Sequence, residues 1–283
     1  MPSPIEIGLG IFLPAVLCGL LLAFARPKGS GGHAALCGIA FGAPWLVSFY
    51  VFYGRSPAWP SPERTLTASD WLAWLVLLAA VSCLLYLAAI PARFLAAVLR
   101  VGLSAALVYL TLARWAERKG SWAALVACFL AFAVVWTLTD AWVARARAPR
   151  APIALAVAAI AASLASLLGR NAVLGEVVGA LSACLVAAAF VPVLRPGFRL
   201  PASAVAIVFL VLGGSLMQGC AFSRLPWTSA GLVAAALLAP GLLELRRASD
   251  TESWKRTLLA VLLALVPAAL AVWTAWIPDE SGY

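Results

Sequence analysis

This chain of 283 residues contains very few of the side chains that carry out chemistry in proteins. It has one histidine (His33), one asparagine (Asn171) and one glutamine (Gln218). Charged residues make up 11% of the chain, whereas a soluble domain has about 25%. This composition excludes a water-soluble fold, and the single histidine excludes a site built from paired imidazoles.

The sequence motifs of common enzymes are absent as well. The chain has no Gly-x-Ser-x-Gly elbow, phosphate-binding loop, HExxH pair or dinucleotide-binding fingerprint. Each of the six cysteines lies in a different apolar segment and none forms a CxxC pair, which argues against a zinc site or a disulfide framework. We therefore expect no catalytic residues, no metal site and no cofactor, and we predict that the protein is not an enzyme.

Positive charge is the one polar property in excess, with a net charge of +9. The cations lie in short loops between apolar segments and form no basic cluster on an amphipathic element. Loop cations of this kind set the orientation of a membrane protein. We therefore expect the lipid bilayer as the partner, with other membrane subunits as an open alternative, and no nucleic acid.

The chain is instead dominated by ten apolar stretches, each about as long as the roughly 17–25 residues of a transmembrane helix. The sequence predicts an all-α polytopic transmembrane bundle that forms a single integral membrane domain over residues 1–283. A lone Arg170 between the sixth and seventh stretches predicts a tight hairpin or a broken helix there. The expected helices are 5–25, 34–53, 70–90, 94–113, 121–143, 151–169, 171–194, 201–222, 227–244 and 257–277.

The distribution of Lys and Arg predicts the orientation, because short positive loops stay in the cytoplasm. Twelve of these residues lie in the odd-numbered connections and seven in the even-numbered ones, so both termini are expected outside. The stretches 151–169 and 227–244 are the least secure spans. If either did not cross the membrane, the orientation of every helix after it would be reversed. Many arginines, few lysines and abundant alanine indicate a bacterial inner (cytoplasmic) membrane.

Ionisable residues inside apolar segments are functional candidates by default, and three stand out here: Arg100, Asp140 and Glu176. Arg100 and Asp140 fall toward the cytoplasmic ends of consecutive helices, so they can meet. The simplest interpretation is that Arg100 extends to the inner headgroups while Arg145 or Arg147 reaches Asp140. A structural Arg100–Asp140 ion pair is the candidate alternative, and a substrate or proton site is a third.

Glu176 is the first candidate for a functional residue. It follows Gly175 and precedes Gly179, and this small-residue spacing lets another helix approach closely. A carboxylate beside such a contact can bind a cation or relay a proton. The alternative is an acid at headgroup level near Arg170.

Three further residues complete the predicted set. Gly38 and Gly42 form a second helix-packing pair with the same spacing. Gln218 is the second candidate functional residue, since it is the only strongly polar group in the eighth stretch. It either lines a pore or forms a buried hydrogen bond between helices.

The sequence favours a non-enzymatic scaffold, assembly or accessory subunit of a membrane complex, because the helices offer few polar groups at midplane depth, where transporters bind their substrates. A transporter of a small or lipophilic substrate is the alternative, which the helix count and Glu176 permit. A polar cavity that reaches Glu176 or Gln218 would favour transport. A closed interior with a large apolar external patch would favour a subunit.

Overall fold

The computed structural model describes residues 3–24, 31–60, 66–87, 92–146, 149–195, 197–245 and 253–276. Every regular element in these ranges is helical. The α-helices are α1 (Pro4–Ile7), α2 (Leu13–Phe24), α3 (Gly31–Tyr53), α4 (Ala68–Ser82), α5 (Ala92–Lys119), α6 (Trp122–Val143), α7 (Arg150–Leu168), α8 (Ala172–Leu194), α9 (Ala202–Phe222), α10 (Trp227–Leu238), α11 (Gly241–Leu245) and α12 (Ser253–Trp276), with a π-helical turn η1 (Gly8–Phe12) and a 3-10 helix η2 (Cys83–Leu87).

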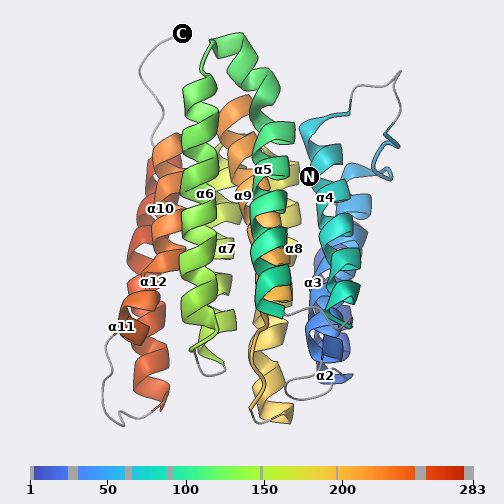
Figure 1. The fold of residues 1–283 in the computed structure, drawn as a ribbon, viewed down its shortest axis with the longest axis vertical. Coiled ribbons are helices and arrows are strands. Elements are labelled where there is room, and N and C mark those ends of the chain that lie inside the picture. The colour runs from blue at the N-terminus through green and yellow to red at the C-terminus, as the bar shows by residue number, and fades with distance from the viewer. Residues whose placement is uncertain are drawn as a thin grey trace.

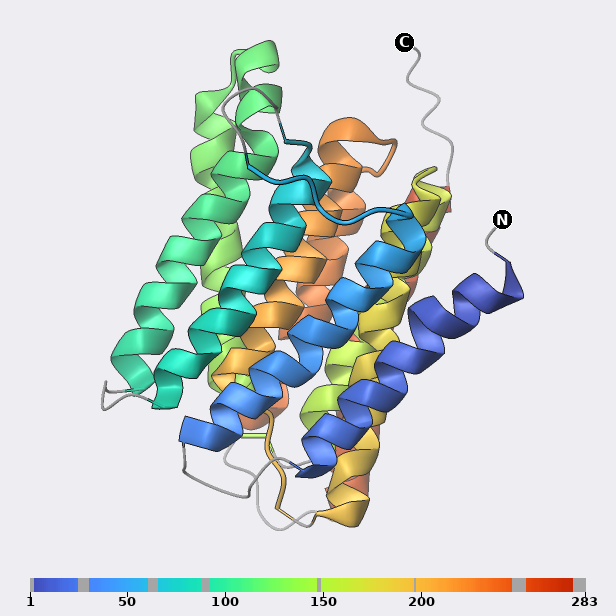
Figure 2. The ribbon, with the colours of Figure 1, turned by 90° about the vertical axis from the view of Figure 1, so that its right-hand side faces the viewer.

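Ten helical stretches in the described residues are long and apolar enough to cross a membrane, which confirms the predicted polytopic bundle. Because the number of crossings is even, α1 begins and α12 ends on the same side (Figure 1; Figure 2). We call this side the terminal end. Helices α4, α6, α8 and α10 also begin at this end, whereas α3, α5, α7, α9 and α12 begin at the opposite end (Figure 1; Figure 2).

Helix α5 extends six residues beyond the predicted end at residue 113. The prediction that Arg114 and Arg118 lie in a loop is therefore wrong, since both belong to the helix. The hydrophobic pattern ends at Ala113, but a helix satisfies its own backbone and continues past the apolar region. It stops only at Gly120, whose φ of +61° is left-handed. The Gly120 and Ser121 amides then donate to the carbonyls of Glu117 and Ala116, at 3.3 and 3.0 Å, as in a Schellman cap.

Two other predicted helices differ from the observed elements. The predicted helix 70–90 is α-helical from Ala68 to Ser82 and then tightens into η2. The predicted helix 227–244 is interrupted between α10 and α11, because Pro240 has no backbone N–H to continue the hydrogen-bond series. The remaining helices begin or end within four residues of the predicted limits.

The connection between α7 and α8 is a tight hairpin. Arg170 has a left-handed φ of +62°, a conformation that glycine adopts more readily than a residue with a side chain. The Asn171 amide donates to the Ser166 carbonyl at 3.0 Å, and the Asn171 side chain accepts from the Leu174 amide at 3.1 Å. One short segment thus ends α7 and begins α8, so the two helices pack along their lengths.

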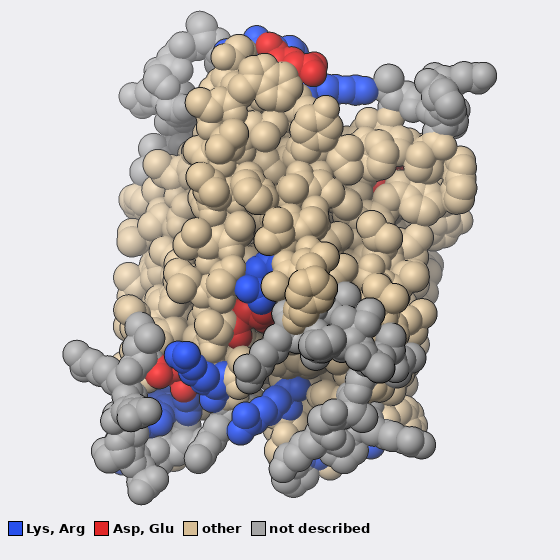
Figure 3. Space-filling model, viewed as in Figure 1, with Lys and Arg blue, Asp and Glu red and all other residues tan. Residues whose placement is uncertain are grey.

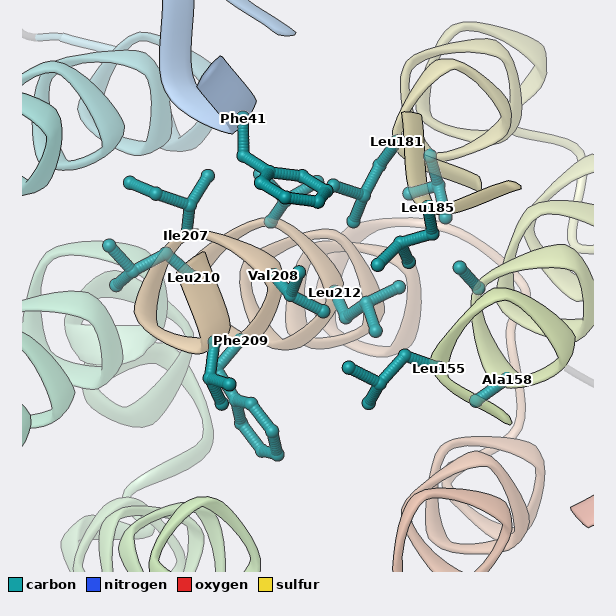
Figure 4. Packing of buried hydrophobic residues seen from close by; sticks show 14 of the residues in the cluster. Phe41, Leu155, Ala158, Leu181, Leu185, Ile207, Val208, Phe209, Leu210 and Leu212 are labelled. Carbon is teal, nitrogen blue, oxygen red and sulfur yellow. The ribbon is translucent and has the colours of Figure 1, made fainter. Parts of the chain in front are cut away.

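Helix α9 lies at the centre of the bundle and is the most completely buried span. Its apolar side chains project in several directions (Figure 4). Ile207 and Val208 lie near Phe41 of α3, and Leu212 lies between Leu155 of α7 and the leucines of α8. The middle of the bundle is therefore filled with hydrocarbon.

Many of the exposed large side chains are apolar. On the face that Figure 3 shows, charged side chains gather mainly at the two ends, and a broad band of uncharged residues lies between them. A group of blue and red side chains lies within this band, and a smaller red spot lies toward its upper right. Helix α6 contributes an exposed ridge at four-residue spacing, and this spacing places side chains on one helix face. The ridge consists of Trp122, Val126, Leu130, Val134 and Leu138.

Candidate functional site

A polar cavity of about 330 Å³ opens at the terminal end between α4, α5 and α9. We call it the terminal cavity. Its walls come from the chain before and at the start of α4, about the last three turns of α5, the end of α9 and the α7–α8 connection. The lining residues are Leu66, Thr67, Ala68, Ser69, Trp71, Leu110, Thr111, Arg114, Arg118, Asn171, Gln218, Phe222 and Ser223.

Gln218 lines this cavity and also links α9 to α4. Its Nε2 donates to the Ala68 carbonyl at 3.1 Å, and its Oε1 accepts from the Ser69 hydroxyl at 2.9 Å. The Tyr53 hydroxyl in turn donates to Ser69 Oγ at 2.9 Å. The two interpretations of Gln218 are therefore compatible, since an interhelical hydrogen bond fixes a side chain that also lines a polar cavity.

Helix α5 supplies the cationic wall. Thr111, Arg114 and Arg118 follow one another at three- and four-residue intervals, which places them on one helix face. Thr111 is only 2% exposed, yet its hydroxyl has no hydrogen-bond partner among the described residues. A buried polar group of this kind is costly unless it is paired. The Arg118 guanidinium lies 6.0 Å from the centre of the Phe222 ring, over the far wall.

The nearest buried acid, Asp70, is already occupied. Its carboxylate accepts from two nitrogens of Arg55 at 2.8 and 3.2 Å and from the Thr67 hydroxyl at 2.6 Å. The Ala58 amide donates to it at 3.1 Å. The hydrogen bonds with Asp70 raise the pKa of Arg55 above its ordinary value. Asp70 therefore anchors the segment before α4 and leaves the charge of the cavity positive.

Apolar side chains pack closely against Gly214 of α9, about one turn below the residues that line the terminal cavity. A Cβ added to Gly214 of α9 would lie 2.6 Å from Leu72 Cδ1 and 3.1 Å from Leu107 Cδ1. Leu72 and Leu107 are almost wholly buried and lie about one turn below Ser69 and Thr111. We call Gly214, Leu72 and Leu107 the seal, since they pack together between the level of the cavity and the middle of the bundle.

A second group of polar side chains lies near the interface of α4, α5 and α9, toward the opposite end of the bundle. Arg100 of α5 and Asp140 of α6 form an ion pair, and Arg100 Nη1 donates to the Thr137 hydroxyl at 3.3 Å. A cavity of about 10 Å³, about the space of one water molecule, adjoins the pair and reaches Ser203 of α9. Arg100 therefore pairs with Asp140. No ion pair joins the expected alternative partner Arg145 to Asp140, and Arg147, the other alternative, lies outside the described residues.

The structure places Glu176 away from both cavities. It lies half-buried on α8 and forms no ion pair within the described residues, with Arg170 or with any other partner. The glycines next to it do contact a neighbouring helix. A Cβ on Gly175 would meet Leu167 of α7, and the Ser163 hydroxyl donates to the Gly175 carbonyl at 2.6 Å.

The remaining predicted glycines also lie at close helix contacts. A Cβ on Gly179 would lie 3.3 Å from the Ser163 hydroxyl. A Cβ on Gly38 would overlap the sulfur of Cys83, and one on Gly42 would lie 2.8 Å from Ala80 Cβ. Helices α3 and α4 therefore approach each other where only hydrogen fits.

Sequence reasoning missed two ion pairs and most of the terminal cavity. Arg150 and Glu244 join α7 to α11 in a buried pair, and Arg55 pairs with Asp70 across a connection. All four residues lie in or next to predicted connections, and nothing in the local sequence indicates which of them meet. The spacing of Thr111, Arg114 and Arg118 is helical and could have indicated their shared face. The predicted helix, however, ends at residue 113, before the two arginines.

No protein-family model matches this chain, and no curated protein is significantly similar to it. Fold and site together therefore define its class. It is a multi-pass helical membrane protein with a polar cavity at one end of the bundle. No cluster of three or more His, Cys, Asp or Glu side chains in the described part of the chain has the arrangement to hold a metal ion.

Proposed function

We propose that this protein is a non-enzymatic carrier for a small polar solute, which binds in the terminal cavity and crosses along the interface of α4, α5 and α9. The observation that carries the proposal is the cavity itself. Its volume of about 330 Å³ lies at the lower end of the range of small-molecule sites. Its wall includes a buried glutamine and a buried, unpaired hydroxyl.

The arrangement of polar groups along one interface supports this proposal. The terminal cavity lies above the seal, and the Arg100–Asp140 pair with its small cavity lies on the other side of it. On α5 between the terminal cavity and this pair, the Ser104 hydroxyl is buried and has no hydrogen-bond partner in the described part of the chain. Carriers of alternating access expose a site first to one side and then to the other. The seal is then the barrier that must separate when the solute passes.

The proposal is tested by solute efflux from proteoliposomes that contain the purified full-length protein. Labelled acetate, choline and glycerol sample an anion, a cation and a neutral solute of small size. A carrier releases at least one of them faster than protein-free liposomes do, and with saturation. Equal release of all three with and without protein would overturn the carrier as proposed for solutes of this size.

Variants of the seal make this experiment specific. Leu107→Ala shortens a side chain of the seal, so the solute that is carried should be released several-fold faster. Leu112→Ala is the matched control, because Leu112 is equally buried on the same helix but is not among the side chains nearest to Gly214. An equal change in both variants would show a general loosening of the bundle and count against the seal.

An accessory or scaffold subunit is the second candidate function. The filled middle of the bundle and the exposed apolar ridge of α6 support it. Mild extraction from native membranes followed by native electrophoresis tests it. A stable species larger than the purified protein, combined with no solute flux in proteoliposomes, would favour the subunit over the carrier.

The proposal retains the remaining expectations from the sequence. We place the protein in a bacterial inner membrane with the terminal end outside, with lipid as its surroundings and without nucleic acid as a partner. The excess of Lys and Arg in the odd-numbered connections supports this orientation. Reporter fusions at the C-terminus test it, since an enzyme active only outside the cytoplasm should be active there.

A further inference from the structure

We infer that the terminal cavity is an oxyanion site, and that the solute it accepts is a small organic anion with an apolar body. That the ligand is a transported solute rests on the proposed function. The oxyanion site itself depends only on the residues that line the cavity. The chemistry that the cavity recognises is a carboxylate or phosphate group. Such a group can belong to a free solute or to a lipid headgroup.

The charges around the cavity are the first argument. Arg114 and Arg118 are four residues apart on α5, so their positions differ by only about 6 Å along the helix axis. Like charges at this spacing destabilise a helix. No ion pair joins either guanidinium to a carboxylate in the described part of the chain. An anion held between them would remove this repulsion.

No acidic side chain belongs to the lining of the terminal cavity. The buried acid nearby, Asp70, is bound to Arg55 and to the segment before α4. Glu117 lies between the two arginines in sequence but does not line the cavity. The lining is therefore positive, and a cationic solute would find no partner in it.

Neutral hydrogen-bond donors deeper in the cavity are the second argument. The Thr111 hydroxyl is buried, lines the cavity and has no partner among the described residues. Gln218 Nε2 uses one of its two hydrogens on the Ala68 carbonyl. Two guanidinium groups at the mouth and neutral donors below them suit an oxyanion, because charged hydrogen bonds between arginine and a carboxylate or phosphate are strong.

The apolar part of the wall defines the rest of the ligand. Leu66, Trp71, Leu110 and Phe222 line the same cavity. Aromatic and aliphatic walls with a few placed polar groups are typical of small-molecule sites. An inorganic ion would leave these side chains unused, so the geometry favours an anion that carries a short aromatic or aliphatic group.

Benzoate and benzamide provide a matched pair of probes, since they share shape and differ in charge. Each is titrated by calorimetry into the full-length protein in nanodiscs of phosphatidylcholine. Benzoate should bind and benzamide should bind at least tenfold more weakly. Equal binding of the two, or binding of neither, would overturn the oxyanion site.

Variants assign the binding to the arginines. Arg114→Gln and Arg118→Gln should each weaken benzoate binding about tenfold or more, because each removes a charged hydrogen bond. Lys119→Gln is the control, with the same change of charge at the same helix end but outside the lining. A loss with Lys119→Gln equal to that with either arginine variant would reduce the effect to general electrostatics and overturn the assignment.

The last arm separates the two sources of the anion. If the ligand is a free solute, benzoate binds equally in nanodiscs of phosphatidylcholine and phosphatidylglycerol. If it is a headgroup, phosphatidylglycerol lowers benzoate affinity, and Arg114→Gln removes that competition. Both outcomes support the oxyanion site. Benzoate binding without any solute flux in proteoliposomes would leave the site intact while contradicting the carrier.

Discussion

The Arg100–Asp140 ion pair should be essential to the stability of the bundle. The side chains are 19% and 12% exposed, so removing one leaves the other charge largely without water. Breaking a buried pair in this way costs about 3–5 kcal/mol. Arg100→Met also loses the hydrogen bond to Thr137, worth about 1 kcal/mol. Because both side chains retain some exposure, we expect a total loss of about 3 kcal/mol, at the lower end of that range.

The free energy of unfolding can be measured by titrating detergent-solubilised protein with a denaturing detergent. Arg100→Asp and Asp140→Arg should each be destabilised at least as much as Arg100→Met. The double reversal should recover most of the lost stability, because it restores an opposite-charge pair at the same contact. A double variant no more stable than the two single variants would refute the ion pair as a stabilising contact between α5 and α6.

The Arg55–Asp70 pair provides the comparison for this experiment. Arg55 is 45% exposed, and Asp70 retains hydrogen bonds from Thr67 and Ala58 when the guanidinium is lost. Exposed ion pairs contribute about 0–1 kcal/mol. Arg55→Met should therefore cost no more than about 1 kcal/mol. A loss as large as that of Arg100→Met would mean that exposure does not distinguish the two pairs.

Three further predictions concern single positions. Gly38→Ala should lower the free energy of unfolding by about 1–3 kcal/mol, because its Cβ overlaps Cys83, whereas Gly102→Ala on α5, which meets open space, should raise it by about 0.5–1 kcal/mol. Thermal unfolding of the two variants side by side checks the difference, and equal effects would contradict the close contact. Arg170→Gly should stabilise the protein by about 1 kcal/mol, since it relieves a left-handed backbone; a decrease in melting temperature would show that the arginine side chain contributes more than the strain costs. Glu176→Gln should leave solute flux and membrane abundance within twofold of the wild type, because Glu176 lines neither cavity, and lost flux at normal abundance would move the transport route to α8.

Much of the architecture follows from local sequence. Ten apolar stretches of spanning length can satisfy their backbones in a bilayer only as helices, and all ten appear. The glycine pairs at 38 and 42 and at 175 and 179 lie at close contacts because their spacing puts them on one helix face. The boundaries were less predictable, since hydropathy marks where lipid ends and α5 continues to its glycine cap.

The candidate site was only partly predictable. Gln218 stood out because a lone amide in an apolar helix needs partners, but its partners at Ser69 and Ala68 lie about 150 positions away along the chain. Glu176 stood out for the same reason, yet it lies outside both cavities. A polar side chain in a membrane segment needs hydrogen-bond partners. The local sequence does not indicate whether a neighbouring helix or a polar cavity provides them.

That this is a helical membrane protein with ten spans follows from its local sequence, because such stretches can satisfy their backbones in lipid only as helices. The central position of α9 and the meeting of particular charges depend instead on how the helices pack together. This packing brings Thr111, Arg114 and Gln218 from α5 and α9 around one cavity, and it places Leu72 and Leu107 against Gly214 beneath them. The physical reason is that apolar helix faces are nearly interchangeable in lipid, so close packing of particular side chains chooses the neighbours.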